Sequence, residues 1–302
     1  MSEQPSAARD RSVRHRYSVL MDPIRRIRRP VLRSPRAFMA FEGWNDACDA
    51  ASGAASFLLG QVEAEPFALI EPEEFYDFQI HRPRIVIDDG GTRRLTWPAT
   101  SAYAIDMAPQ PRDLVVVTGD EPNHRWKTYT RLVTALLAES DVEMVITLGA
   151  FIGHVAHTQP VPIVGVATHP DLLIQHGIAA SSYEGPTGIV GVMLEACREV
   201  GIPALSLWAA TPHYLAANPS PQAMLALLTQ AASVAGISID TTELETAAAE
   251  FQSRVDAALE QNDEFAEYVH QLEDESVAGP VDSEFAGGML VSEIEDFLRD
   301  RD

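Results

Sequence analysis

Short apolar runs alternate along the chain with longer segments in which apolar residues recur at helical spacing. The segment 182–212 shows this alternation most clearly, because a glycine-rich turn precedes a helix-spaced stretch and then a nearly continuous apolar run. The positions that share one face of the helix predicted at 189–200 are Ile189, Val192, Met193, Ala196, Cys197 and Val200. Gly201 suits the left-handed cap that ends a helix, and the run 204–212 is typical of a buried parallel strand.

The same alternation extends over most of the chain. It predicts strands at 37–43, 67–70, 113–119, 142–149 and 162–167, and helices at 47–59, 124–139 and 220–235. Strands that alternate with helices favour an α/β fold of three layers around a mostly parallel sheet. The turn residues Asp89–Thr92, between two β-prone runs, predict a β-hairpin over 84–97 that is inserted in this alternation and projects from one edge of the sheet.

Two segments outside this alternation differ in composition. Residues 1–36 contain ten arginines against three acidic residues, a net charge of +7, and few apolar residues, which predicts a disordered basic arm that is dispensable for folding. The α/β core domain then covers 37–238. Residues 239–302 form an acidic helical extension, in which spacing over 244–272 predicts a helical hairpin and 284–302 a further weak helix.

Composition excludes several classes of protein. The whole chain has a net charge of −22, and an acidic body repels nucleic acid and anionic lipid, so we expect neither as a partner. No apolar run approaches the length of a membrane span, and no apolar segment of a secretory signal follows the first basic residues, so we expect a cytoplasmic protein. Cys48 and Cys197 fall in predicted helices and are expected to be small buried residues.

Polar residues gather at the carboxyl ends of the predicted strands, where open α/β sheets bind their ligands. The candidates for this cleft are Glu42, Asn45, Asp46, Glu121, Glu184, Thr187 and His213. Together they would do acid–base chemistry or hold a cation. The alternative is that Asn45 or Asp46 caps the helix at 47–59 and that the others are solvated turn residues. We favour this alternative because no catalytic motif accompanies the cluster.

Other patterns give weaker indications of a site. The turn Gly185–Gly188 before a helix offers free N–H groups to an anion, but it lacks the lysine and the glycine spacing of nucleotide-binding loops. His154 and His157 are spaced for one side of a turn, without the further ligands that zinc requires. Ser181 and Ser182 lie outside a nucleophile elbow. We therefore expect no catalytic residue, no metal and no cofactor.

Four short motifs stand at the predicted strand ends and turns. They are Phe41-Glu-Gly-Trp-Asn-Asp46, Val117-Thr-Gly-Asp-Glu121, Thr147-Leu-Gly-Ala150 and, above all, Tyr183-Glu-Gly-Pro-Thr-Gly188 with its helix. With these motifs the chain resembles the proteasome assembly chaperone family, in its bacterial and actinobacterial branch, over about residues 37–236. The resemblance implies a sheet like that of phosphorylase/hydrolase-like folds, self-association and, as in better-understood members, binding to proteasome α-subunits.

Two functions are open at this point. The first is a non-enzymatic assembly chaperone or adaptor that acts as a homo-oligomer, with a homotrimer as the expected state and proteasome subunits or another protein as partner. We expect the small-residue helix 47–59 or the tail helices in the contact between copies. The second function is a hydrolase- or phosphorylase-like enzyme that uses the carboxylates and His213. A deep cleft joining Asp46, Glu121 and Glu184 would favour the enzyme, and a capped strand-end surface the adaptor.

Overall fold

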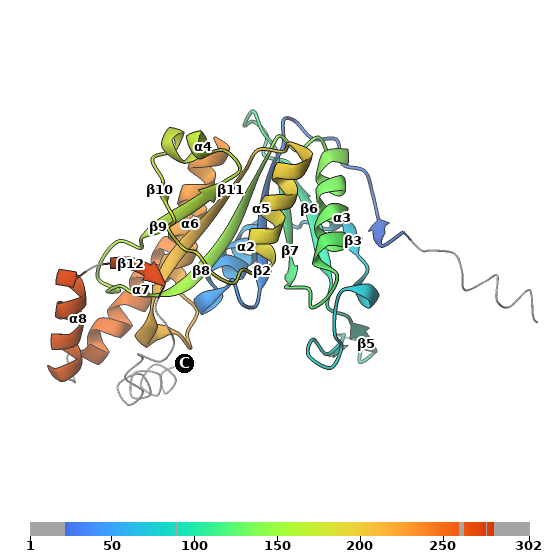
Figure 1. Cartoon of the computed structure of the whole chain (residues 1–302). Helices are drawn as coiled ribbons and strands as arrows, with labels where there is room; N and C mark the ends of the chain where they lie inside the picture. The colour runs from blue at the N-terminus through green and yellow to red at the C-terminus, as the bar shows by residue number, and fades with distance from the viewer. Residues whose placement is uncertain (1–21, 89, 260–262, 276, 281–302) are drawn as a thin grey trace, which may run out of the picture.

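The computed structural model describes residues 22–88, 90–259, 263–275 and 277–280, and one mixed sheet runs through it (Figure 1). The order of its strands is β1-β3-β6-β7-β2-β8-β11-β9-β10, with β12 paired to β8. Their bounds are β1 Ile24–Arg26, β3 Pro66–Ile70, β6 Thr100–Ile105, β7 Leu114–Asp120, β2 Arg36–Glu42, β8 Met144–His154, β11 Ala204–Pro212, β9 Ile163–Ala167, β10 Ala179–Ala180 and β12 Val277–Pro280.

The centre of the sheet is parallel and its flanks are largely antiparallel. Strands β7, β2, β8 and β11 run in one direction, with Phe38 of β2 between Val116 of β7 and Ile146 of β8. Strands β6, β3 and β1 alternate in direction on one side, and β9 is antiparallel to β11 on the other. The central strands are apolar on both faces because helices cover both sides. The prediction of a three-layer α/β fold is therefore confirmed.

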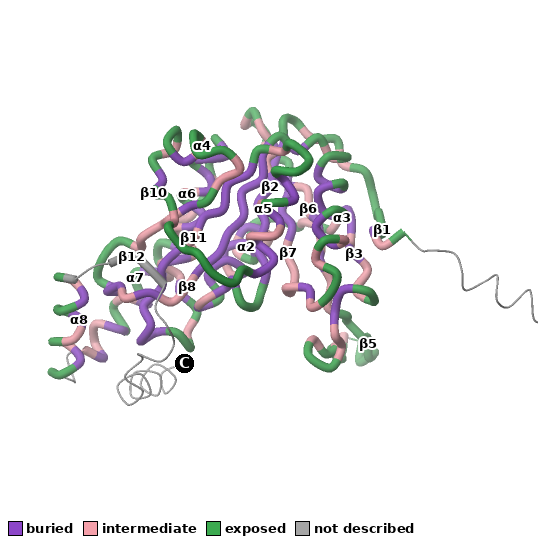
Figure 2. The backbone as a smooth tube through the Cα atoms, viewed as in Figure 1, coloured by how far each residue is buried: buried purple, intermediate pink, exposed green. Residues whose placement is uncertain are grey.

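Two pairs of helices form the outer layers. Helices α2 (Ala50–Gly60) and α6 (Pro221–Ala235) pack on each other and cover one face, and α3 (Trp126–Glu139) and α5 (Ile189–Val200) cover the other. The side chain of Ser220 accepts the Ala223 amide and so begins α6 as expected. Figure 2 shows the buried strands between these layers. The alanines of α2 are buried against the sheet and α6, so this face of the helix is not free to contact another copy, whereas Ser56 and Gly60 are exposed.

The buried face of α5 is rotated slightly from the predicted one. Ile189, Met193, Ala196 and Cys197 are buried as expected, together with Val190. Val192 is only half-buried and Val200 is exposed. The rotation follows from packing, since α5 lies against α3 as well as against the sheet.

The acidic extension covers the protein's own body. Helices α7 (Thr242–Leu259) and α8 (Asp263–Glu275) form the predicted hairpin. Its apolar stripe is already covered: Leu244 joins the main core, and Phe251 and Val255 pack with Tyr214. The expected contact of this stripe with a second copy is therefore wrong. The helix predicted at 284–302 lies outside the described residues.

Three further segments depart from the predictions. Strand β8 continues past its predicted end at 149 to His154, because β11 pairs with it as far as Gly153 and β12 pairs with His154. Cys48 lies in a short 3-10 turn, Ala47–Asp49, although it and Cys197 are buried as expected. A short helix, α4 (Pro170–Gln175), was not foreseen. The predicted hairpin, in contrast, is present as strands β4 (Arg84–Ile87) and β5 (Arg93–Thr96).

No helix in the described ranges is both long and apolar enough to cross a membrane.

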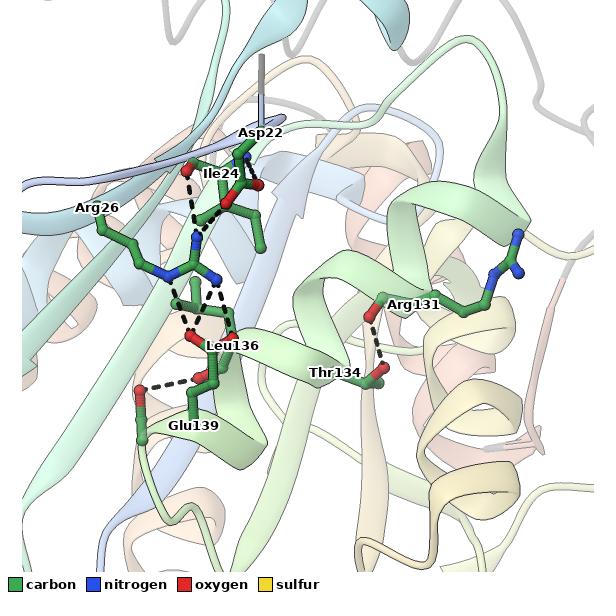
Figure 3. Close-up of polar contacts among 8 residues, drawn as sticks. Asp22, Ile24, Arg26, Arg131, Thr134, Leu136 and Glu139 are labelled. Atoms are coloured by element: carbon green, nitrogen blue, oxygen red, sulfur yellow. Dashed lines mark hydrogen bonds and ion pairs between the residues drawn. The ribbon is translucent and has the colours of Figure 1, made fainter. Parts of the chain in front are cut away.

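Part of the expected basic arm, Ile24–Arg26, belongs to the sheet. Strand β1 pairs with β3, and the side chain of Ile24 is buried between the sheet and α3. The Arg26 guanidinium donates to Glu139 at the end of α3 at 2.9 Å and to Asp22 at 2.6 Å (Figure 3). Arginines in this segment therefore pair with the acidic body, which corrects the prediction of disorder for residues 22–36. Residues 1–21 lie outside the described part of the chain.

Shortening Ile24 is expected to destabilise the fold. Ile24→Ala should lower the free energy of unfolding by about 2 kcal/mol, because it truncates a buried isoleucine. Ile24 is the one buried side chain of β1, so the contact of this strand with the core depends on it. The control is Val31→Ala, at a side chain that is 98% exposed, which should change nothing. Urea unfolding followed by circular dichroism measures both. Equal stability of the two variants would show that β1 contributes nothing to the fold.

Candidate functional site

The first polar cluster at the strand ends joins the loop after β2, the end of β7 and the start of α5. The carboxylate of Glu121 accepts two hydrogen bonds on Oε1, from Asn45 Nδ2 at 2.9 Å and from the Ile189 amide at 2.6 Å. Asn45 is 1% exposed. The Ile189 amide belongs to the first turn of α5, where N–H groups lack partners in the helix and negative charge is favoured. Glu121 thus already occupies the position that the turn 185–188 was expected to offer to an anion.

Gly188 makes this junction possible. A Cβ atom at this position would lie 2.5 Å from Asn45 Oδ1 and 2.6 Å from Glu121 Oε1, closer than atoms can pack. Gly43 has a φ of 115°, which disfavours other residues, and its Cα faces the Glu121 side chain. Glycines at these two positions are therefore needed by the geometry of the junction.

A second glycine motif serves packing within the sheet. A Cβ on Gly149 would lie 2.7 Å from the ring of Trp208, which crosses it from the neighbouring strand β11. Thr147, two residues earlier, donates its hydroxyl to the buried Ser206 Oγ at 2.8 Å. These contacts explain the residue types in the segment 147–150 without a ligand.

Asp46 binds the start of α2. Its Oδ1 accepts the amides of Ala51 at 2.7 Å and Ser52 at 3.1 Å in the first turn of α2, although the residue at the N-cap position of this helix is Asp49. Of the two residues expected to cap the helix, Asp46 and not Asn45 binds its first amides. Burial raises the pKa of the Asp46 carboxyl, although hydrogen bonds from Ser52 and Ala51 oppose this effect. Cys48 and Asp49 that follow adopt left-handed backbone conformations, with φ of 56° and 49°.

The remaining expected residues do not join one cleft. Burial, and then the charge of Asp120, raise the pKa of Glu42 at the end of β2. Glu184 and Thr187 are exposed to solvent. His213 turns toward the acidic extension, where its Nε2 lies 2.9 Å from the hydroxyl of Tyr268. The predicted seven-residue cluster is therefore divided into separate structural roles.

A cavity of about 400 Å³ lies beside this region, between the loop 43–49 and the segment 216–218. Of the expected residues only Asp46 lines it, and neither Glu121 nor His213 does. Among the described residues, no group of three or more His, Cys, Asp or Glu side chains is placed to hold a metal ion. The cavity is therefore bordered by one buried carboxylate, that of Asp46, whose Oδ1 is bound to backbone amides.

A histidine cluster that the sequence did not reveal attaches the acidic extension to the body. His157 is buried, with Nδ1 2.8 Å from the Tyr214 hydroxyl and Nε2 3.1 Å from Asp256 Oδ1 of α7. The spacing of His154 and His157 indicated only a turn, and their partners are far away in sequence. Burial lowers the pKa of His157 and also that of His213, where the neighbouring His154 adds to the effect.

Acidification is expected to weaken this attachment. In the unfolded chain these histidines have their ordinary pKa, near 6.5, which is above the folded value. The unfolded state therefore binds more protons as the pH falls through this window, and stability decreases from about pH 7.5 to about pH 5.5. Melting temperatures at the two pH values should show a smaller decrease for His157→Gln than for the wild type. The exposed His124→Gln is the control, and an unchanged slope in His157→Gln would contradict the assignment.

The chain is similar to known proteins in both sequence and structure. A family model described as the PAC2 family matches residues 40–259. A PAC2 family protein from Streptomyces avermitilis is similar in structure, with 44% sequence identity, 78% of this chain and 99% of that chain covered, and a TM-score of 0.73. A proteasome-assembly chaperone homologue from Mycobacterium tuberculosis has 39% identity, 77% and 99% coverage and a TM-score of 0.71.

More distant structures share the fold. An archaeal proteasome activator from Pyrococcus furiosus has 20% identity, 76% and 95% coverage and a TM-score of 0.59. A comparison with curated protein sequences gives no match.

Proposed function

Because the chain belongs to the PAC2 family, we propose that it is a non-enzymatic assembly chaperone or adaptor that acts as a homo-oligomer on a proteasome-related protein. The Mycobacterium tuberculosis relative is a proteasome-assembly chaperone homologue, and it is similar over nearly all of its own length. The proposed oligomer is a trimer, and the proposed partners are proteasome α-subunits.

One observation from the site carries this proposal. The polar residues in the motifs at the strand ends bind the protein's own backbone: Glu121 binds the amide that begins α5, and Asp46 binds the amides that begin α2. The glycines between them permit close approach of neighbouring segments. A surface capped in this way supports a role in binding proteins, whereas an enzyme would need these carboxylates to face a substrate.

Capture of the partner tests the proposal. The tagged chain is used as bait in a native lysate, beside an unrelated acidic protein of similar net charge, and bound proteins are identified by mass spectrometry. We expect proteasome subunits to be enriched over the acidic control. If no proteasome subunit is captured and the purified chain converts a small molecule catalytically, the enzyme would be favoured instead.

A further inference from the structure

The β4–β5 hairpin exposes an apolar face. Ile85, Ile87 and Leu95 lie on one side of it, because Ile85 is opposite Leu95 in the register and Ile87 is two residues away. They are 61%, 60% and 51% exposed. Figure 1 shows the hairpin projecting from the body, and in the described chain its two strands pair only with each other. An isolated two-stranded sheet is marginally stable, so this face gains from being covered.

The same face carries positive charge. Arg93 lies opposite Ile87, on the apolar side, and it has no hydrogen-bond or ion-pair partner within the described residues. Arg84 and Arg94 are exposed on the other side, where Arg94 pairs with Asp88. The hairpin is therefore a basic and apolar projection on a chain whose net charge is −22.

A groove of about 740 Å³ at the other end of the strands has the complementary character. Its apolar lining includes Phe57, Ile105, Met107 and Ile239. Its acidic residues are Asp106, Asp240 and Glu243, and none of the described residues that line it is a lysine or arginine. Asp106 pairs with Arg33, whereas the carboxylate of Glu243 is exposed on the first turn of α7.

A hairpin cannot reach the groove of its own chain. The hairpin leads into the start of β6, beside Thr118 at the carboxyl end of β7, whereas the groove contains Ile105 and Leu114 at the opposite ends of these strands. The length of β6 separates them by about 20 Å. Projection and groove thus lie at opposite ends of one chain, which is the arrangement that a head-to-tail contact between copies requires.

We propose that the β4–β5 hairpin of one copy docks into this acidic, partly apolar groove of a second copy, with Arg93 facing Glu243. This inference rests on the homo-oligomer of the proposed function and names its contact surface. Charge complementarity selects the occupant: two hairpins would bring arginines together, whereas hairpin and groove bring opposite charges and two apolar surfaces together. The groove includes Phe57 near the end of helix 47–59 and Glu243 at the start of the tail helices, so this contact uses the ends of these segments, whereas their alanine face and apolar stripe pack on the body.

A charge exchange tests the pairing. Arg93→Glu and Glu243→Arg are each expected to raise the dissociation constant of the oligomer about tenfold or more, measured by analytical ultracentrifugation. The double variant should return to within about threefold of the wild type, since the opposite charges again face each other. Arg131→Glu, at an exposed arginine of α3, makes the same change in net charge and should leave association unaltered.

The apolar contact is tested separately. Leu95→Ser should dissociate the oligomer without changing the melting temperature of the subunit, and Val31→Ser is the matched control at another exposed apolar residue. An oligomer that persists in Leu95→Ser and Arg93→Glu would overturn this inference and leave the proposed homo-oligomer intact. If these variants lost the binding of another protein while their oligomeric state stayed the same, the inference would also be overturned. A wild-type monomer at micromolar concentration would contradict both proposals.

Discussion

Met193→Asp is expected to yield no cooperatively folded protein. Met193 is fully buried in α5, within the cluster that joins this helix to the central strands and to α3. An aspartate there would be either charged without a partner or protonated at a cost, and it would also leave the space of the methionine partly empty. The combined loss is about 5 kcal/mol or more, which is comparable with the whole stability of many domains.

Val192→Asp, one residue earlier, provides the matched comparison. Because position 192 is only half-buried, the carboxylate of the introduced aspartate can reach water, and the variant should remain soluble and fold cooperatively. Soluble yield and urea unfolding followed by circular dichroism measure both proteins. If Met193→Asp unfolded with a free energy close to that of Val192→Asp, the assignment of the buried face of α5 would be wrong.

Gly188→Ala is expected to lower the free energy of unfolding by about 3 kcal/mol. The added methyl group would lie 2.6 Å from Glu121 Oε1, so the carboxylate must move and give up its bonds to Asn45 and to the Ile189 amide. Hydrogen bonds to a charged group each contribute about 1.5–3 kcal/mol, and the loss leaves Asn45 buried without its partner.

The control for this substitution is Gly60→Ala. Gly60 is the last residue of α2, and a Cβ there would meet no atom within 4 Å. Alanine favours helix over glycine by about 1 kcal/mol, so this variant should be as stable as the wild type or slightly more stable. Thermal and urea unfolding of the two variants compare them directly. Equal stabilities would mean that the junction of Asn45, Glu121 and Gly188 does not hold the strand-end loops.

Much of the fold could be predicted because local patterns agree with it. The helix α5 was visible from its apolar spacing and Gly201, the start of α6 from Ser220, and the β4–β5 hairpin from the turn residues between its strands. Strand β1 was missed because it has only three residues, two of them exposed arginines, and its single buried side chain gives no periodicity. Such an edge strand is specified by its partner β3.

For the candidate site, the sequence predicted which residues lie at the ends of the strands but not the partners that they bind. The sequence placed Asn45 and Glu121 among seven candidate residues at strand ends, and the structure pairs these two because β2 and β7 are neighbouring parallel strands. The sequence could not show that the second hydrogen bond on Glu121 comes from a backbone amide, since this depends on how α5 approaches the sheet. His213 was placed in the same cluster because it follows β11, but the acidic extension supplies its partner Tyr268 from a distant segment.

The central proposal is that the chain acts by binding a proteasome-related protein, and a binding measurement on purified components tests it most directly. Purified chain and purified proteasome α-subunits are mixed, and the complexes are identified by native mass spectrometry, with serum albumin as an acidic control. We expect a complex of defined stoichiometry that contains both the chain and α-subunits and that is absent with albumin. Wild-type chain that is folded and oligomeric, yet forms no complex with α-subunits at concentrations of about 10 μM, would contradict the proposal.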